Sequence, residues 1–355
     1  MSVLHNLTSW QAIVVDNWLA SKQACKTLIV KQSFEFDQQG QVFALETSAN
    51  LELTDQMSAE PSASSLALAC ETVPFKQGFE LYGNLTAYPP KHKQAKVIEV
   101  SLSLHQQQQT VFNKVLRVTG DRHWKSSILG SKATDPEVLH AVALSYENTY
   151  GGIDEEKPER IFEQNPVGIG FRVKQIKASP LPKVEYPNSC LTHPKNIGVV
   201  ASYGPIPQFW QPRLSLMPEV EPIETLAGNY PFQAPLLANS YNYAPTDQQL
   251  ALTYNQELSL SLKGLVPNRD YHDTITLKLP YDKPIAACIQ GEHQQPIELT
   301  CDTLVLDSDA NTFHLLWRKS IASEEISASA IMVVQQQEKT ANNIAEPSTN
   351  SAVEA

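Results

Sequence analysis

Alternation of apolar and polar residues recurs along this chain and constrains its fold more than any other feature. Successive side chains of a β-strand point to opposite faces, so each alternating stretch predicts a strand with one buried face. The clearest examples are "VIEVSLSL" (97–104), "ELSLSL" (257–262), "TITLKL" (274–279) and "TFHLLWRK" (312–319). Residues rich in β-branched and aromatic side chains predict further strands at 26–36, 113–120 and 328–337.

Signals for helices are few. "DPEVLHAVALSY" could begin a helix with Asp135 as its cap and Pro136 in its first turn, but it also fits an extended segment. "TDQQLALTY" could form one or two helical turns. Prolines crowd the region from Pro158 to Pro245, and each removes a backbone donor, so this region should be irregular. We therefore predict a mostly-β fold of antiparallel sheets, sandwich or barrel-like, with long Pro/Gly-rich loops and few short helices.

The chain divides into three parts by composition. Residues 1–125 form a strand-rich half, and residues 126–337 hold the Pro/Gly-rich middle and a second set of strands. The boundary is placed at "GSKATDP" (130–136), and the two halves could share one core. Residues 338–355 lack aromatic side chains and apolar periodicity, which predicts a disordered tail whose deletion leaves the melting temperature unchanged.

Composition argues against several classes of function. A formal net charge of −11 disfavours nucleic-acid binding, which needs a basic surface to neutralise phosphates. No apolar run approaches the roughly 20 residues of a membrane-spanning helix, and no signal peptide is readable. Five widely spaced cysteines suggest reduced thiols, so we expect a cytoplasmic protein without membrane contact.

The stretch "YENTYGGIDEEKPERIFEQNPVGIGF" (146–171) is the most heavily specified loop. Its glycines do not have the spacing of a dinucleotide-binding loop, and its acids do not alternate as in a calcium loop, so no cofactor or metal is expected. Glycines permit positive φ, and a proline makes the residue before it extended. We interpret the stretch as structural corners, which are either a buried crossing between sheets or a presented recognition surface. The motif residues are Glu147, Gly151, Gly152, Asn165, Pro166, Gly168 and Gly170.

Candidates for catalysis are weak. The histidines lack the spacing of a metal site, and His123 in "GDRHW" reads as a polar residue at a strand end. Cys190 and His193 are close in sequence, but no third group is identifiable that would orient them. Carboxylates for glycoside hydrolysis could come from Glu147, Asp154 and Glu185, although any chain with 38 acids offers such sets. No catalytic residue is assigned, and we expect that the protein is not an enzyme.

Several segments in order resemble a bacterial domain-of-unknown-function family linked to type VI secretion. They are "GDRHW" (120–124), "YENTYGG" (146–152), "NPVGIGF" (165–171), "LPKVEYP" (181–187), "YGPIPQFWQPR" (203–213) and "APTDQQL" (244–250), with a similar "SSL…ETVPFKQG" stretch near residue 65. The resemblance covers about residues 10–280. One region departs from it: "MPEVEPIETLAGNYPFQAPLL" (217–237) lacks the glycine-threonine-tyrosine-aspartate turn and second tryptophan that the family usually has there.

The resemblance implies a non-catalytic adaptor, or chaperone, that binds a toxin effector and loads it onto the spike of the secretion machine. Its partners would be the toxin and a spike or spike-tip protein. By residue type, the expected partner-binding anchors are Tyr203, Phe209, Trp210 and Arg213. Two alternatives stay open, namely a structural component of the secretion apparatus and a hydrolase on a β scaffold.

Overall fold

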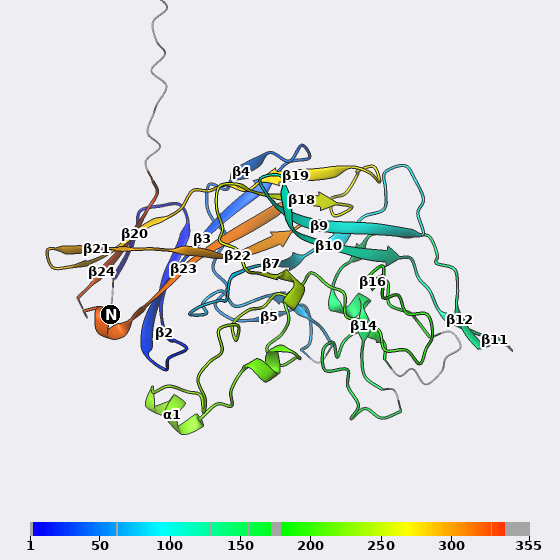
Figure 1. Cartoon of the computed structure of the whole chain (residues 1–355), viewed down its shortest axis with the longest axis horizontal. Coiled ribbons are helices and arrows are strands. Elements are labelled where there is room, and N and C mark those ends of the chain that lie inside the picture. The colour runs from blue at the N-terminus through cyan, green and yellow to red at the C-terminus, as the bar shows by residue number, and fades with distance from the viewer. Residues whose placement is uncertain are drawn as a thin grey trace, which may run out of the picture.

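Two β-sheets packed against each other form the core of the molecule (Figure 1). The structure is a computed structural model, and it describes residues 3–61, 63–127, 130–154, 156–171, 179–327 and 329–337. The predicted tail, residues 338–355, lies outside the described residues.

The larger sheet has the strand order β17-β7-β22-β23-β3-β2, with β4 paired to β3. Its neighbouring strands are antiparallel except for β7 and β22, which are parallel. The strands are β2 (Gln11–Trp18), β3 (Ala24–Phe36), β4 (Val42–Ala44), β7 (Phe79–Asn84), β17 (Gln249–Leu250), β22 (Thr300–Asp307) and β23 (Thr312–Ala322).

The second sheet is antiparallel throughout and has the order β16-β10-β9-β18-β19. Its strands are β9 (Val97–Gln106), β10 (Gln109–Thr119), β16 (Val184–Glu185), β18 (Leu258–Lys263) and β19 (Thr274–Lys278). A third sheet, β1-β24-β20-β21, comprises β1 (Val3–Asn6), β20 (Ile285–Gln290), β21 (His293–Ile297) and β24 (Ile331–Gln335).

Short pairs and turns complete the described fold. The two-stranded pairs are β5 (Gln56–Met57) with β6 (Leu66–Leu68), β8 (Thr86–Ala87) with β13 (Val142–Ala143), β11 (Trp124–Ser127) with β12 (Gly130–Ala133), and β14 (Tyr150–Gly151) with β15 (Ile169–Gly170). The helical elements are α1 (Pro222–Ala227) and the 3-10 turns η1 (Tyr146–Asn148), η2 (Arg213–Leu216), η3 (Thr246–Gln248) and η4 (Ser323–Glu325).

The alternating patterns mark the faces that form the core. In β9 the apolar side chains from Ile98 to Leu104 are buried while the polar ones between them are not, and β18 and β19 follow the same rule. These side chains meet those of β3, β7, β22 and β23 in one hydrophobic cluster, as expected for a sandwich. The predicted mostly-β, antiparallel fold with few short helices is confirmed, and no sheet closes into a barrel in the part described.

Both large sheets contain strands from each half of the sequence. β3 pairs with β23, β7 pairs with β22, and β9 pairs with β18. The main hydrophobic cluster correspondingly runs from Trp10 to Val334. The halves thus share a core, because neither can complete its sheets without strands from the other.

The proline-rich middle is irregular, as predicted. Between β16 and β17 the chain holds α1, η2 and η3 but no strand. Residues 136–141, for which helix and extended chain were both considered, lead into β13 without helical structure. "TDQQLALTY" forms one 3-10 turn, η3, which is followed directly by the strand β17. The helix α1 was not expected, although Pro222 in its first turn and Gly228 after its end are typical helix boundaries.

Candidate functional site: an apolar groove formed by two loops

The loop from Tyr146 to Phe171 is closed by a short parallel pairing of β14 with β15. Asn165, which is fully buried, lies between them, and its side-chain nitrogen donates to the carbonyl oxygens of Tyr146 (2.8 Å) and Tyr150 (3.0 Å) and to the Thr149 hydroxyl (2.9 Å). Its backbone carbonyl oxygen accepts from the Gly152 N–H at 2.8 Å. One asparagine therefore holds both ends of the loop in register.

The glycines are required because the backbone packs tightly around Asn165. A Cβ on Gly151 would lie 2.2 Å from the Asn165 carbonyl oxygen, and one on Gly168 would lie 2.4 Å from the Asn165 side-chain nitrogen. Gly152 and Gly170 have φ of +110° and +99°, a conformation that favours glycine. The corner interpretation of these glycines therefore matches their geometry.

Glu147 ties the loop to a distant segment. Its carboxylate accepts from the Ser65 backbone N–H at 2.6 Å and from the Ser65 hydroxyl at 2.9 Å. Burial opposes ionisation of this carboxyl, but hydrogen bonds from Ser145 and Ser65 outweigh it and hold its pKa below the usual value. The hydrogen bonds of the Glu147 carboxylate thus connect two of the segments that carry the family resemblance.

Aromatic side chains form the base of the loop. Phe162 packs against Tyr150 and Phe171, with ring centroids 5.1 and 5.4 Å apart. Tyr146 packs edge-on against Trp210 at 5.4 Å and donates its hydroxyl to the Gly204 carbonyl. The loop 203–214 is in this way fixed onto the loop 146–171.

An apolar groove of about 740 Å³ opens between these two loops. Ile153 and Ile161 from the first loop are each 43% exposed, and Phe209 and Leu214 from the second are 52% and 50% exposed. Pro166, Val167 and Phe171 complete the apolar part together with Pro61, and the buried Trp210 lies at its base. Glu159, Arg160 and Glu163 supply a charged border. An apolar interior with a polar border is typical of a surface that binds another molecule.

The four residues predicted as anchors have different environments. Phe209 is half exposed and lines the groove, whereas Tyr203, Trp210 and Arg213 are buried. The Tyr203 hydroxyl donates to the Lys114 carbonyl, and the Arg213 guanidinium donates to the Ile206 carbonyl at 2.6 Å while lying 3.7 Å from the centre of the Tyr243 ring. Tyr203 and Arg213 stabilise the loops and do not line the groove, whereas the exposed Phe209 and the buried Trp210 both line it.

The other segments of the resemblance meet at a buried lysine. The Lys114 ammonium donates to the Ser202 carbonyl (2.7 Å), Asp247 (3.0 Å) and Gln248 (2.6 Å). Burial lowers the pKa of Lys114 to about 8, with the attraction of Asp247 acting against this shift. Tyr186 donates its hydroxyl to Asp247 at 2.8 Å. Lys114 thus links the regions 181–187, 203–213 and 244–250 to the second sheet.

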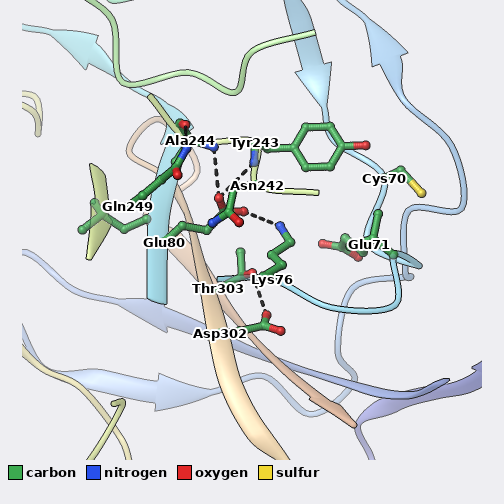
Figure 2. Close-up of polar contacts among 12 residues, drawn as sticks. Cys70, Glu71, Lys76, Glu80, Asn242, Tyr243, Ala244, Gln249, Asp302 and Thr303 are labelled. Carbon is green, nitrogen blue, oxygen red and sulfur yellow. Dashed lines mark hydrogen bonds and ion pairs between the residues drawn. The ribbon is translucent and has the colours of Figure 1, made fainter. Parts of the chain in front are cut away.

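A second polar cluster secures the chain that follows the groove (Figure 2). The Glu80 carboxylate accepts from the backbone N–H groups of Tyr243 (2.9 Å) and Ala244 (3.1 Å) and pairs with Lys76. Asn242 exchanges two hydrogen bonds with the backbone of Gln77. Since these groups are buried and matched, the cluster is a structural connection between β7 and the middle region.

The carboxylates considered for catalysis have separate structural partners. Glu185 pairs with Arg122 at 2.7 Å and accepts from the Leu191 N–H, while Asp154 accepts from the backbone of its own turn. Within the described residues, no three His, Cys, Asp or Glu side chains are grouped to hold a metal.

The remaining catalytic candidates are also in structural settings. Burial, with the nearby Glu185 charge, raises the pKa of the Cys190 thiol, which makes it a poorer nucleophile. The His193 ring accepts a hydrogen bond from the Lys195 backbone, and His123 pairs with Pro180 through an isolated β-bridge.

Among the helices in the described ranges, none is long and apolar enough to cross a membrane.

Comparison with known families identifies a bacterial family whose function is not characterised. Residues 21–318 match the family model described as "uncharacterized protein conserved in bacteria (DUF2169)". The chain belongs to this family. The match includes both groove-forming loops, the buried Lys114 cluster and most strands of the two large sheets. No curated protein and no solved structure matches the chain.

Several groove residues were not singled out from the sequence. Ile153 and Ile161 flank an acidic turn, and Leu214 follows the arginine that was chosen as an anchor. A single isoleucine in a charged loop is common on protein surfaces, and it does not reveal that the two loops face each other. That arrangement depends on the Tyr146–Trp210 contact, which joins positions 64 residues apart.

Proposed function

We propose that the protein is a non-catalytic adaptor of the type VI secretion system. It binds a toxin effector in the cytoplasm, keeps it competent for docking and delivers it to the spike or spike-tip protein. The groove between the loops 146–171 and 203–214 is the site that receives the toxin. The observation that carries this proposal is the half-exposed apolar lining of the groove, formed by segments of the resemblance to secretion adaptors.

The rigidity of the groove supports a binding role. Asn165 and the packed glycines fix one wall, and the Tyr146–Trp210 contact fixes the other against it. A preformed site loses little conformational entropy when it binds, so more of the contact energy appears as affinity. Burying one exposed Leu or Phe side chain contributes about 1.5–3 kcal/mol. Several such side chains are needed to offset the cost of association and reach sub-micromolar affinity, roughly −8 kcal/mol.

Deletion of the gene tests the role in cells. We expect delivery of a toxin encoded beside this gene to stop, while the tube protein of the secretion machine still appears in the medium. A catalytically inactive form of that toxin should co-elute with the purified adaptor. Complementation with the wild-type gene is the control and should restore delivery.

Two outcomes would contradict the proposal in different ways. If tube secretion also stops, the protein is a structural component of the apparatus. If the toxin is delivered normally without this protein, the adaptor role is wrong.

A further inference from the structure

The segment from Met217 to Leu237, called here the arm, presents apolar side chains away from the body. Ile223 and Leu226 are 78% and 89% exposed, and α1, which carries them, buries none of its residues. Residues three apart on a helix lie on the same face, so these two side chains form one apolar knob. In Figure 1, α1 lies beyond the edge of the sheets.

The arm has a defined structure despite this exposure. Its two sides pair through a bridge between Val220 and Phe232, and the Glu221 N–H donates to the Pro231 carbonyl at 2.7 Å. Gly228, at φ +72°, ends the helix in the left-handed conformation. A helix of six residues has little stability of its own, so these contacts are what hold the knob in place.

Contacts beside α1 and at the base of the arm fix it to the body. The Tyr230 ring packs edge-on against Trp18 with centroids 5.8 Å apart, and the Lys22 ammonium lies 5.3 Å from the centre of the same ring. The Ser240 hydroxyl donates to the Leu216 carbonyl at 3.0 Å. The knob is thus held outward by structure on both sides of it.

The arm is acidic as well as apolar. It carries Glu219, Glu221 and Glu224, and the sequence has no lysine or arginine between Arg213 and Lys263. An apolar knob beside three carboxylates is complementary to an apolar depression that is bordered by basic side chains. This charge pattern specifies the chemistry of the surface that would cover the knob.

The arm begins close to the groove. Leu214 lines the groove, and Met217 is three residues further along the chain, which limits their separation to about 11 Å. Ile223 is nine residues from Leu214 and lies at most about 32 Å away. A small domain is about 30 Å across, so one partner can contact the groove and the knob together.

We propose that the arm is a second contact for the toxin that occupies the groove. Ile223 and Leu226 insert into an apolar depression on the toxin surface that is bordered by lysine or arginine. This inference rests on the proposed function. It adds that two separate contacts hold the toxin, the groove and the arm. The groove receives apolar side chains of the toxin, and the toxin receives the knob of the arm.

The test compares binding of the full-length protein to a purified, catalytically inactive toxin encoded beside its gene. We expect the double variant Ile223→Ser/Leu226→Ser to bind at least about 20-fold more weakly, since two buried apolar side chains are lost. Ile197→Ser is the matched control, because Ile197 is 77% exposed on another loop, and its affinity should not change. Both variants alter exposed side chains, so their melting temperatures should equal that of the wild type.

Salt dependence tests the proposed charge of the partner surface. The wild-type affinity should fall as the salt concentration rises from 50 to 500 mM, since screening weakens attraction between exposed charges. Glu219→Gln/Glu221→Gln should bind more weakly at low salt and show a flatter dependence. A wild-type affinity that does not change with salt would mean that the toxin surface is not basic, and the inference would be wrong.

The remaining outcomes separate this inference from the proposed function. If the wild type does not bind the toxin at all, the adaptor proposal itself fails. If the wild type binds and the double variant binds equally well, only the arm inference fails. It also fails if the double variant loses affinity for the spike protein instead, or turns a wild-type dimer into a monomer, because the arm would then have a different partner.

Discussion

Replacing Asn165 with alanine tests whether one side chain holds the wall of the groove. The two N–H hydrogens of the fully buried Asn165 amide are shared among three acceptors, and the Asn165 backbone joins the two ends of the loop. Each hydrogen bond contributes about 1 kcal/mol net, and acceptors left without a donor add to the loss. We expect Asn165→Ala to lower the free energy of unfolding by about 3 kcal/mol.

Urea unfolding followed by tryptophan fluorescence measures this loss, because Trp210 packs on Tyr146, whose carbonyl accepts from Asn165. Asn196→Ala is the control, since Asn196 is exposed and its side chain makes one long hydrogen bond of 3.3 Å. Its effect should stay within about 0.5 kcal/mol. A loss below about 1 kcal/mol for Asn165→Ala, or a loss equal to that of the control, would refute the assigned role.

Three further predictions concern stability. Gly152→Ala should destabilise the protein more than Gly170→Ala. Both positions have positive φ, which costs about 1–3 kcal/mol with alanine, but only at Gly152 would the Cβ lie within 2.6 Å of a carbonyl oxygen. Equal losses of stability in urea unfolding would contradict this. Lys114→Met should lower the free energy of unfolding by about 3 kcal/mol or more in the same assay, because three acceptors lose a buried donor. An unchanged stability would show that the cluster is dispensable. Burial lowers the pKa of His314 from 6.5 to about 4, so between these values the unfolded state binds a proton that the folded state does not. The contribution of His314 to the free energy of unfolding is complete above pH 6.5 and falls by up to about 3 kcal/mol towards pH 4. If a His314→Asn variant loses as much stability as the wild type over this range, another group is responsible.

Local patterns were sufficient to predict the strands that pack with one face against the core. β9, β18 and β19 bury every second residue, so their period is visible in the sequence. β3 is different, because it is buried on both faces and includes the polar residues Lys31 and Gln32. Lys31 pairs with Glu71, and Gln32 accepts from the Trp317 indole N–H. Those partners come from distant parts of the chain and leave no periodic signal.

The candidate site shows the same limit. The glycines and Asn165 could be identified as corners, since their conformational roles are local. Trp210 and Arg213 have residue types that are frequent at interfaces, yet both are buried by contacts with Tyr146 and Tyr243. Residue type cannot distinguish an exposed anchor from a buried support, because the difference lies in long-range packing. The series of motifs was the more informative signal, and it led to the family but not to the surface.

Calorimetric titration of a catalytically inactive toxin, encoded beside the gene, into the purified protein tests the adaptor role most directly. The wild type should bind with sub-micromolar affinity, and Phe209→Ala should bind at least about tenfold more weakly, because the phenyl ring leaves the groove. Phe43→Ala is the matched control, since Phe43 is 46% exposed on β4, and it should bind like the wild type. No binding by the wild type, or equal affinities for all three proteins, would contradict the assignment of the groove as the toxin-binding site.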